Sequence, residues 1–390
     1  MPSRSCSPLT EPCGTARSVI HPAEWGATSA QQLCIALTNE ASFGTDGAPD
    51  LVGVVLPGGW QVTRHVGEGG MAHVYEGMRD GDRAAIKVLH KALVSKPEIA
   101  FRFRREGELV DSIESPHVPK VLGRGKDATG RPWIAFEFVE GRELSAILDE
   151  RGKLPPKVAV EIARQACEAL RAAHLAGVVH RDVKPDNIIV DGSLDGEPSA
   201  LRVKVLDFSV SKDEDLAFTQ QGLVIGTPVY MAVEQAMGNP VTPAVDIYSL
   251  GAILYDMLSG KPPYDHDEPG RVLATLLTGP PTPLSRVDPT LPQILTAVVD
   301  RAMAREAKHR FPMIETLIDA LDDVHRSLET PEEVAARLSL GIPFPAASHV
   351  TPAPVEHFPE PPRTHYTALI IVGMLMVLSA VGMILLKASL

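Results

Sequence analysis

The chain has 390 residues, of which 44% are hydrophobic, so it is long enough for two lobes with a sizeable core. Its net charge of −12 argues against a nucleic-acid-binding protein, because such proteins normally need a basic face. Its four cysteines form no C-x-x-C pair, which gives no sign of a zinc or thioredoxin-like motif and fits a reduced, cytosolic functional part.

The first part of the chain changes character near Trp60. Residues 1–57 are expected to form a disordered extension, because Ser, Pro, Gly, Ala and Thr dominate it and no hydrophobic period is sustained. No secretory signal is visible there. Residues 60–63 and 84–89 are then typical of strands, with a turn predicted at residues 80–82.

The middle of the chain alternates helical and extended patterns. Helices are predicted over residues 98–112 and 155–176, the second of which starts at two prolines and stops at Gly177. Residues 134–139 read as an apolar strand, and two further strands are expected to pair around a polar excursion. These are residues 188–190 and 201–206. The clearest later helices are predicted over residues 246–258, 291–305 and 313–328.

The C-terminal part is predicted to contain a membrane anchor. Residues 329–365 are expected to form a short helix and a Pro-rich linker. Residues 366–386 follow without a charged side chain, and a helix of that length spans roughly 30 Å, about one hydrocarbon core. We expect a transmembrane helix rather than a buried core helix. Arg363 and Lys387 flank it on opposite sides, so flanking charge does not fix its orientation.

Two features of the first lobe are suited to phosphate binding. Residues 67–74 read G-E-G-G-M-A-H-V, and such glycines let backbone N–H groups fold over phosphates, although a plain tight hairpin is the alternative. Lys87 lies inside an apolar strand, where an ammonium group is costly unless paired. Glu106 of the following helix is the favoured partner and Glu108 the alternative, unless Lys87 reaches solvent from an edge strand.

The sequence His180-Arg181-Asp182-Val183-Lys184-Pro185-Asp186-Asn187 carries the densest chemistry. It combines a candidate base, two cations and an amide able to bind a metal. Asp207-Phe208-Ser209 follows the next strand, and residues 226–234 end in Ala232-Val233-Glu234.

In their order, these motifs resemble the eukaryotic-type (Hanks-type) serine/threonine protein kinases of bacteria, over about residues 58–328. The resemblance implies an α+β, two-lobed fold, with a small β-rich N-lobe over residues 58–139 and a larger α-helical C-lobe over residues 140–328. The predicted transmembrane helix would be added to this fold. ATP would lie between the lobes. Its metal ion would be Mg²⁺, with Mn²⁺ as the alternative.

The resemblance also implies individual roles. Asp182 would orient the substrate hydroxyl or accept its proton, Lys184 would neutralise the γ-phosphate, and Asn187 and Asp207 would bind Mg²⁺. Phe136 would be the gatekeeper before the hinge. The implied ATP-binding residues are Val66, Gly67, Glu68, Gly69, Gly70, Met71, Ala72, His73, Val74, Ala85, Lys87, Glu106, Phe136, Glu137, Phe138 and Val139.

A third set of residues would organise the site. The implied structural anchors are His180, Arg181, Phe208, Glu234, Asp246 and Arg310. Arg181 would also pair with a phosphorylated activation segment, for which Thr219 is the favoured autophosphorylation site and Thr227 the secondary one.

The expected function is therefore that of a non-specific serine/threonine protein kinase that autophosphorylates and acts on protein Ser/Thr hydroxyls in bacterial signalling. The alternative is a pseudokinase-like ATP-binding scaffold that recruits partners to the membrane, since Ala72, Ser209 and Val233 depart from the family pattern. We expect a single-pass protein of the cell inner membrane, with its kinase domain in the cytoplasm where ATP is supplied. No nucleic-acid partner is expected, and a homodimer is compatible with the family.

Overall fold

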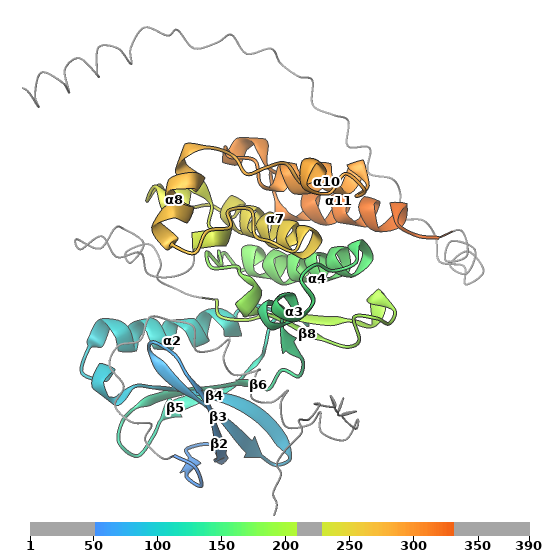
Figure 1. The fold of residues 1–390 in the computed structure, drawn as a ribbon. Coiled ribbons are helices and arrows are strands. Elements are labelled where there is room, and N and C mark those ends of the chain that lie inside the picture. Colours follow the sequence, from blue (N-terminus) through green and yellow to red (C-terminus); the bar gives the residue numbers. More distant parts are fainter. Residues whose placement is uncertain (1–50, 209–227, 331–390) are drawn as a thin grey trace, which may run out of the picture. The chain divides into compact units, whose positions relative to one another are not determined.

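The computed structural model describes residues 51–208 and 228–330, which form a β-rich lobe and a helical lobe (Figure 1). The predictions for Ser209, Thr219, Thr227 and residues 331–386 lie outside this part of the chain. Within residues 51–208 and 228–330, no helix has both the length and the apolar character needed to cross a membrane.

The first lobe is built on an antiparallel sheet with the strand order β1-β2-β3-β4-β6-β5. Its strands are β1 (Val55–Leu56), β2 (Trp60–Glu68), β3 (Ala72–Arg79), β4 (Asp82–Leu89), β5 (Val121–Lys126) and β6 (Pro132–Glu137). The predicted turn joins β3 to β4, and Asp80 and Gly81 adopt φ values of 52° and 94° there. A short turn with two such residues matches the twist of a hairpin.

Helix α2 (Pro97–Asp111) lies against this sheet and was predicted within one residue at each end. It approaches β6 closely at Gly107, where a Cβ atom would lie 2.9 Å from Ile134 Cδ1. The missing side chain lets the helix sit near the sheet and brings the neighbouring Glu106 toward the strand that carries Lys87.

The lobe begins earlier than the sequence indicated. Residues 51–57 are part of the described structure, although residues up to 57 were predicted to be disordered. Leu51 and Leu56 pack with Trp60 in an apolar cluster, and Leu56 is only 2% exposed. A two-residue strand has no readable period, so burial of these leucines on the sheet was not visible in the sequence.

The second lobe is mainly helical. Four predicted helices are present as α4 (Pro156–Leu175), α7 (Ala244–Ser259), α10 (Gln293–Ala302) and α11 (Ile314–Ser327). The structure adds α3 (Leu144–Arg151), α6 (Val233–Ala236), α8 (Pro269–Thr278) and α9 (Leu284–Val287). Residues 245–258 of α7 are buried throughout, so α7 forms the centre of the lobe.

Smaller elements complete the description. A second sheet has the order β7-β8-β9 and consists of β7 (Arg142–Glu143), β8 (Ile188–Asp191) and β9 (Arg202–Val205). The pairing of β8 with β9 was predicted. The 3₁₀ turns are Lys91–Leu93, Pro185–Asn187, Pro198–Ala200, Pro228–Tyr230 and Ala307–His309.

Candidate active site

Lys87 joins two carboxylates that come from different parts of the chain. Its Nζ lies 2.8 Å from Glu106 Oε1 on α2 and 2.6 Å from Asp207 Oδ1 after β9. The structure thus pairs Lys87 with Glu106 rather than with Glu108, which instead contacts Arg105 at 3.1 Å. Lys87 lies on β4, between β3 and β6, so it is not on an edge strand.

The two carboxylates favour the ionised form of Lys87. Burial alone would lower the pKa of Lys87, but Asp207 and Glu106 together raise this pKa above its ordinary value. Burial raises the pKa of Glu106, and although Lys87 opposes that shift, the pKa stays above its ordinary value. Lys87 is therefore a permanent cation at the inner end of the cleft, suited to an anionic ligand.

The loop between α4 and β8 supplies the second group of candidate residues. Lys184 Nζ lies 3.4 Å from Asp182 Oδ2, so a cation sits beside the candidate base. The Asn187 side chain donates through Nδ2 to the Asp182 carbonyl at 2.9 Å. Its Oδ1 is buried and accepts no hydrogen bond from the described residues. A buried, unpaired amide oxygen near Asp207 fits a hard cation such as Mg²⁺, which prefers oxygen ligands.

Asp246 on α7 holds this loop through hydrogen bonds to its backbone. The Asp246 carboxylate accepts backbone hydrogen bonds from His180 at 3.0 Å and Arg181 at 2.8 Å. His174 Nε2, which sequence reasoning missed, lies 2.8 Å from the same carboxylate. The contacts fix the backbone on the N-terminal side of Asp182.

Two residues of the site have left-handed backbone conformations. Arg181 has a φ of 67° and Asp207 a φ of 57°, which non-glycine residues rarely adopt. Such strain is of order 1–3 kcal/mol per residue and persists only where the surroundings impose it. Here it turns the backbone just before Asp182 and at the carboxylate that contacts Lys87.

Phe208 is fully buried and secures the other side of Asp207. The His180 and Phe208 rings lie 4.6 Å apart, and His180 Nε2 donates to the Leu206 carbonyl at 2.8 Å. His180 and Phe208, both named above as structural anchors, thus contact each other. Both residues are buried, so the backbone is fixed directly after Asp207.

A small cavity of about 30 Å³, lined by residues of both lobes, lies beside these charges. Seven of its lining residues were predicted for the site: Ala85, Glu106, Phe136, Glu137, Val139, Asp207 and Phe208. Val110, Pro119 and Leu206 were not predicted. Leu206 could have been found, because it is the apolar residue directly before Asp207.

The remaining predicted ATP-binding residues surround this region. Val66, Gly67 and Glu68 end β2, residues 69–71 form the turn, and Ala72, His73 and Val74 begin β3. Val66, Val74, Ala85 and Phe138 form one apolar cluster. Ala72, where a glycine was expected, is 6% exposed and packs into the core. The loop thus tolerates this methyl group.

The segment after residue 227 is anchored to the helical lobe. Arg310 contacts Glu234 through two hydrogen bonds of 2.6 and 2.8 Å and also donates to three backbone carbonyls. Gln235, which the sequence did not single out, donates to the Arg181 carbonyl at 2.9 Å. Helix α6 therefore couples this segment directly to the loop that carries Asp182.

The fold and this arrangement define a class, and the chain belongs to the protein kinase family: the family described as "Protein kinase domain" matches residues 60–317. A solved structure with a similar fold is the kinase domain of PknI from Mycobacterium tuberculosis. It has a TM-score of 0.54 and 28% identity, and the match covers 71% of this chain and 99% of that one.

Curated relatives point to one branch of the family. Serine/threonine-protein kinase Pkn1 of Myxococcus xanthus is 38% identical over 276 residues, covering 70% of this chain and 39% of that protein. Serine/threonine-protein kinase pkn2 of the same organism is 36% identical, covering 72% and 34%. PknA of Mycobacterium tuberculosis is 35% identical, covering 72% and 64%. The chain thus spans about one third to two thirds of the length of these relatives.

Proposed function

We propose that this chain is a serine/threonine protein kinase that transfers the γ-phosphate of ATP to protein Ser/Thr hydroxyls and to itself in bacterial signalling. One observation carries the proposal. Lys87 bridges Glu106 and Asp207, and the nearby loop presents Asp182, Lys184 and the unpaired Asn187 Oδ1. Phosphoryl transfer depends on positioning and charge neutralisation, which are what this set supplies.

Each residue of the set has a distinct task in this proposal. Lys87 binds the α- and β-phosphates of ATP, and Glu106 keeps it in place. Asn187 and Asp207 hold Mg²⁺, which neutralises phosphate charge when bound. Asp182 accepts a hydrogen bond from the acceptor hydroxyl and orients it toward the phosphate, while Lys184 offsets negative charge beside it. Apolar residues around Ala85 and Leu206 exclude water from the adenine side.

The proposal is tested by incubating the full chain with γ-labelled ATP, with and without Mg²⁺. We expect label on the wild type only when Mg²⁺ is present, and none on Asp182→Asn. Asp191→Asn, which changes a neighbouring carboxylate at the end of β8, is the matched control and should label like the wild type. Equal labelling of Asp182→Asn and wild type would refute the role of Asp182.

The same experiment separates the kinase from a pseudokinase-like scaffold. Ala72 and Val233 stand where the family pattern has glycine and proline, and both are buried without disrupting their elements. A scaffold would bind ATP but label neither itself nor an added Ser/Thr protein. Under the kinase proposal, mass spectrometry of the labelled chain should find phosphate at Thr219, with Thr227 as a secondary site.

We also propose that residues 366–386 anchor the protein in the cell inner membrane, with the kinase domain in the cytoplasm. The charge-free length of this segment and the need for ATP support this arrangement. Full-length chain should remain in the membrane fraction after alkaline washing, whereas a chain ending at residue 365 should be released. Retention of the shortened chain would contradict the anchor. We further propose that the protein forms a homodimer. Analytical ultracentrifugation of the full-length chain and of the chain ending at residue 365 would test this.

A further inference from the structure

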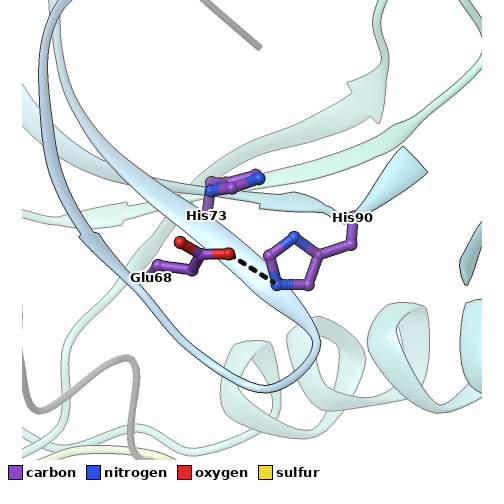
Figure 2. Close-up of side chains that lie close together, drawn as sticks. All are labelled: Glu68, His73 and His90. Atoms are coloured by element: carbon purple, nitrogen blue, oxygen red, sulfur yellow. Dashed lines mark ion pairs between the residues drawn. The ribbon is translucent and has the colours of Figure 1, made fainter. Parts of the chain in front are cut away.

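Three potential metal ligands meet at the base of the glycine-rich loop. Glu68 at the end of β2 pairs with His73 on β3, and His73 pairs with Val88 on β4. Residues directly opposite one another share a face of the sheet, and residues two apart along a strand do as well. Glu68 and His73 therefore lie on one face of the sheet. His90 follows Val88 by two residues, so it lies on the same side. Figure 2 shows the three side chains close together.

Their spacing is near that of a metal site. One ligand atom from each of Glu68, His73 and His90 lies within 4.8 Å of the other two. In a tetrahedral zinc site with bonds of about 2.1 Å, ligand atoms lie about 3.4 Å apart. A shift of roughly 1.4 Å or less at each pair would close the gap. Glu68 can make this shift, because its side chain is 33% exposed and its Oε1 lies 3.9 Å from His90 Nε2.

His73 offers a nitrogen atom that no described residue contacts by a hydrogen bond. Its ring is 1% exposed, and its Nδ1 is buried without such a partner in residues 51–208 and 228–330. The lone pair of an imidazole nitrogen is what a metal ion binds.

An ordinary structural role accounts for only part of this cluster. His73 packs edge-to-face on His90 with ring centroids 4.3 Å apart, and on His65 at 5.6 Å. Stacking explains why the rings are buried. It does not provide a partner for the His73 Nδ1 atom among the described residues, and leaving a buried polar atom without a partner is unfavourable. A metal ion would give this imidazole a ligand interaction.

We propose that Glu68, His73 and His90 bind a divalent transition-metal ion, with zinc as the best match, in a site separate from the one at Asn187 and Asp207. Two imidazoles and one carboxylate form a ligand set that zinc uses with a water molecule in the fourth position. Imidazole ligands disfavour Mg²⁺, which prefers oxygen ligands alone. The inference is independent of phosphoryl transfer.

The site would restrain the glycine-rich loop. In the metal-free protein, His90 Nε2 donates to the Gly69 carbonyl at 2.7 Å, and a metal bound at Nε2 would replace this hydrogen bond. The His90 backbone N–H donates to the Met71 carbonyl at 2.9 Å and would keep that contact. A metal that links Glu68 to His90 would tie the end of β2 to the end of β4. Backbone amides of residues 67–72 should then exchange hydrogen more slowly, because the loop opens less often.

The test is a calorimetric zinc titration of the nucleotide-free full chain without an affinity tag. Cys6, Cys13 and Cys34 are replaced by serine in every sample, so that no thiolate outside the described residues competes. We expect one zinc per chain in the parent and at least tenfold weaker binding in Glu68→Gln, His73→Gln and His90→Gln. Cobalt should give the visible absorption of a tetrahedral site in the parent but not in these three variants.

His266→Gln is the matched control, since His266 is an exposed histidine that contacts only Thr275 among the described residues. It should bind zinc like the parent. If His73→Gln does not fold, Glu68→Gln decides the test, because its side chain is partly exposed. Equal zinc affinity in the parent and Glu68→Gln, saturation only at millimolar zinc, or displacement by millimolar Mg²⁺ would each overturn the proposal. Zinc should slow amide exchange of residues 67–72 in the parent but not in Glu68→Gln.

Discussion

Tyr230 and Asp256 form a buried contact whose protonation state depends on pH. The hydroxyl of Tyr230, in the segment that follows residue 227, donates to Asp256 Oδ2 at 2.6 Å. Burial raises the pKa of Asp256 from 3.8 to about 6, although the Tyr230 hydrogen bond opposes this shift, and the charges of Asp265 and Asp149 add to it. Asp256 is therefore mostly ionised at pH 7 despite its buried position.

Replacing Asp256 by Asn should change how stability depends on pH. Between pH 4 and pH 6 the folded protein binds more protons at Asp256 than the unfolded chain, so this residue's contribution to the free energy of unfolding falls as pH rises. Asn carries no such loss. The free energy of unfolding of Asp256→Asn relative to wild type should rise by up to about 3 kcal/mol from pH 4 to pH 7.

Urea unfolding at both pH values measures this difference. Asp111→Asn, which alters a half-exposed carboxylate paired with Arg124, is the control and should keep a constant offset from wild type. A constant offset for Asp256→Asn as well would show that this carboxyl group does not titrate as described.

Sequence reasoning at the scale of residues identified groups that belong to motifs. Lys87 was marked by its place in an apolar strand, and Glu106 by its place in the next helix. Gln235, His174 and His117 were missed, because each acts through a partly buried hydrogen bond to a distant residue. Such a contact depends on how elements pack, and no local spacing indicates it.

The Glu234–Arg310 pair joins two elements far apart in the chain, helix α6 and the turn before α11. Arg310 is 0% exposed at its side chain, so the pair is shielded from water. Glu234→Gln should lower the free energy of unfolding by about 3–5 kcal/mol, since it leaves a buried guanidinium without its counter-charge. Loss of this anchor should also reduce phosphotransfer, because α6 holds the Arg181 carbonyl through Gln235.

The exposed pair Arg105–Glu108 on α2 provides the matched control. Glu108→Gln should change the free energy of unfolding by no more than about 0.5 kcal/mol, because exposed ion pairs contribute little. Denaturant unfolding of both variants measures the comparison. Similar losses in the two variants would mean that burial of Arg310 does not set the cost.

Elements with a strong period were predictable, and weakly patterned ones were not. Helix α4 carries a long apolar face, and its ends were predicted within a residue. Helix α8 buries only Val272 and Leu276 and contains Gly270, so its pattern is too sparse to recognise. Helix α10 is shorter than expected, since the chain turns at Met303, where the backbone leaves the helical conformation.

Contacts between the two lobes could not be predicted from the sequence, because they depend on how the whole lobes pack together. His117, between α2 and β5, accepts a hydrogen bond from Val205 at 2.9 Å and contacts the Val203 carbonyl at 2.9 Å. Lys204 Nζ lies 2.9 Å from Glu137 at the end of β6. These links fasten β9, and hence Asp207, to the first lobe. Residues of both lobes therefore line the cleft. A ligand bound there should stabilise the whole domain.

That coupling predicts how a nucleotide should stabilise the protein. A non-hydrolysable ATP analogue at 100 times its dissociation constant, with Mg²⁺, should raise the free energy of unfolding of the full chain by about 2.7 kcal/mol. Chelating Mg²⁺ at the same analogue concentration should reduce this gain, because Asn187 and Asp207 would then contact no shared cation. Asp207→Asn should lose the Mg²⁺-dependent part, whereas Asp191→Asn should keep it. Thermal unfolding with and without chelator measures the effect, and an identical gain in both conditions for the wild type would contradict Asn187 and Asp207 as metal ligands.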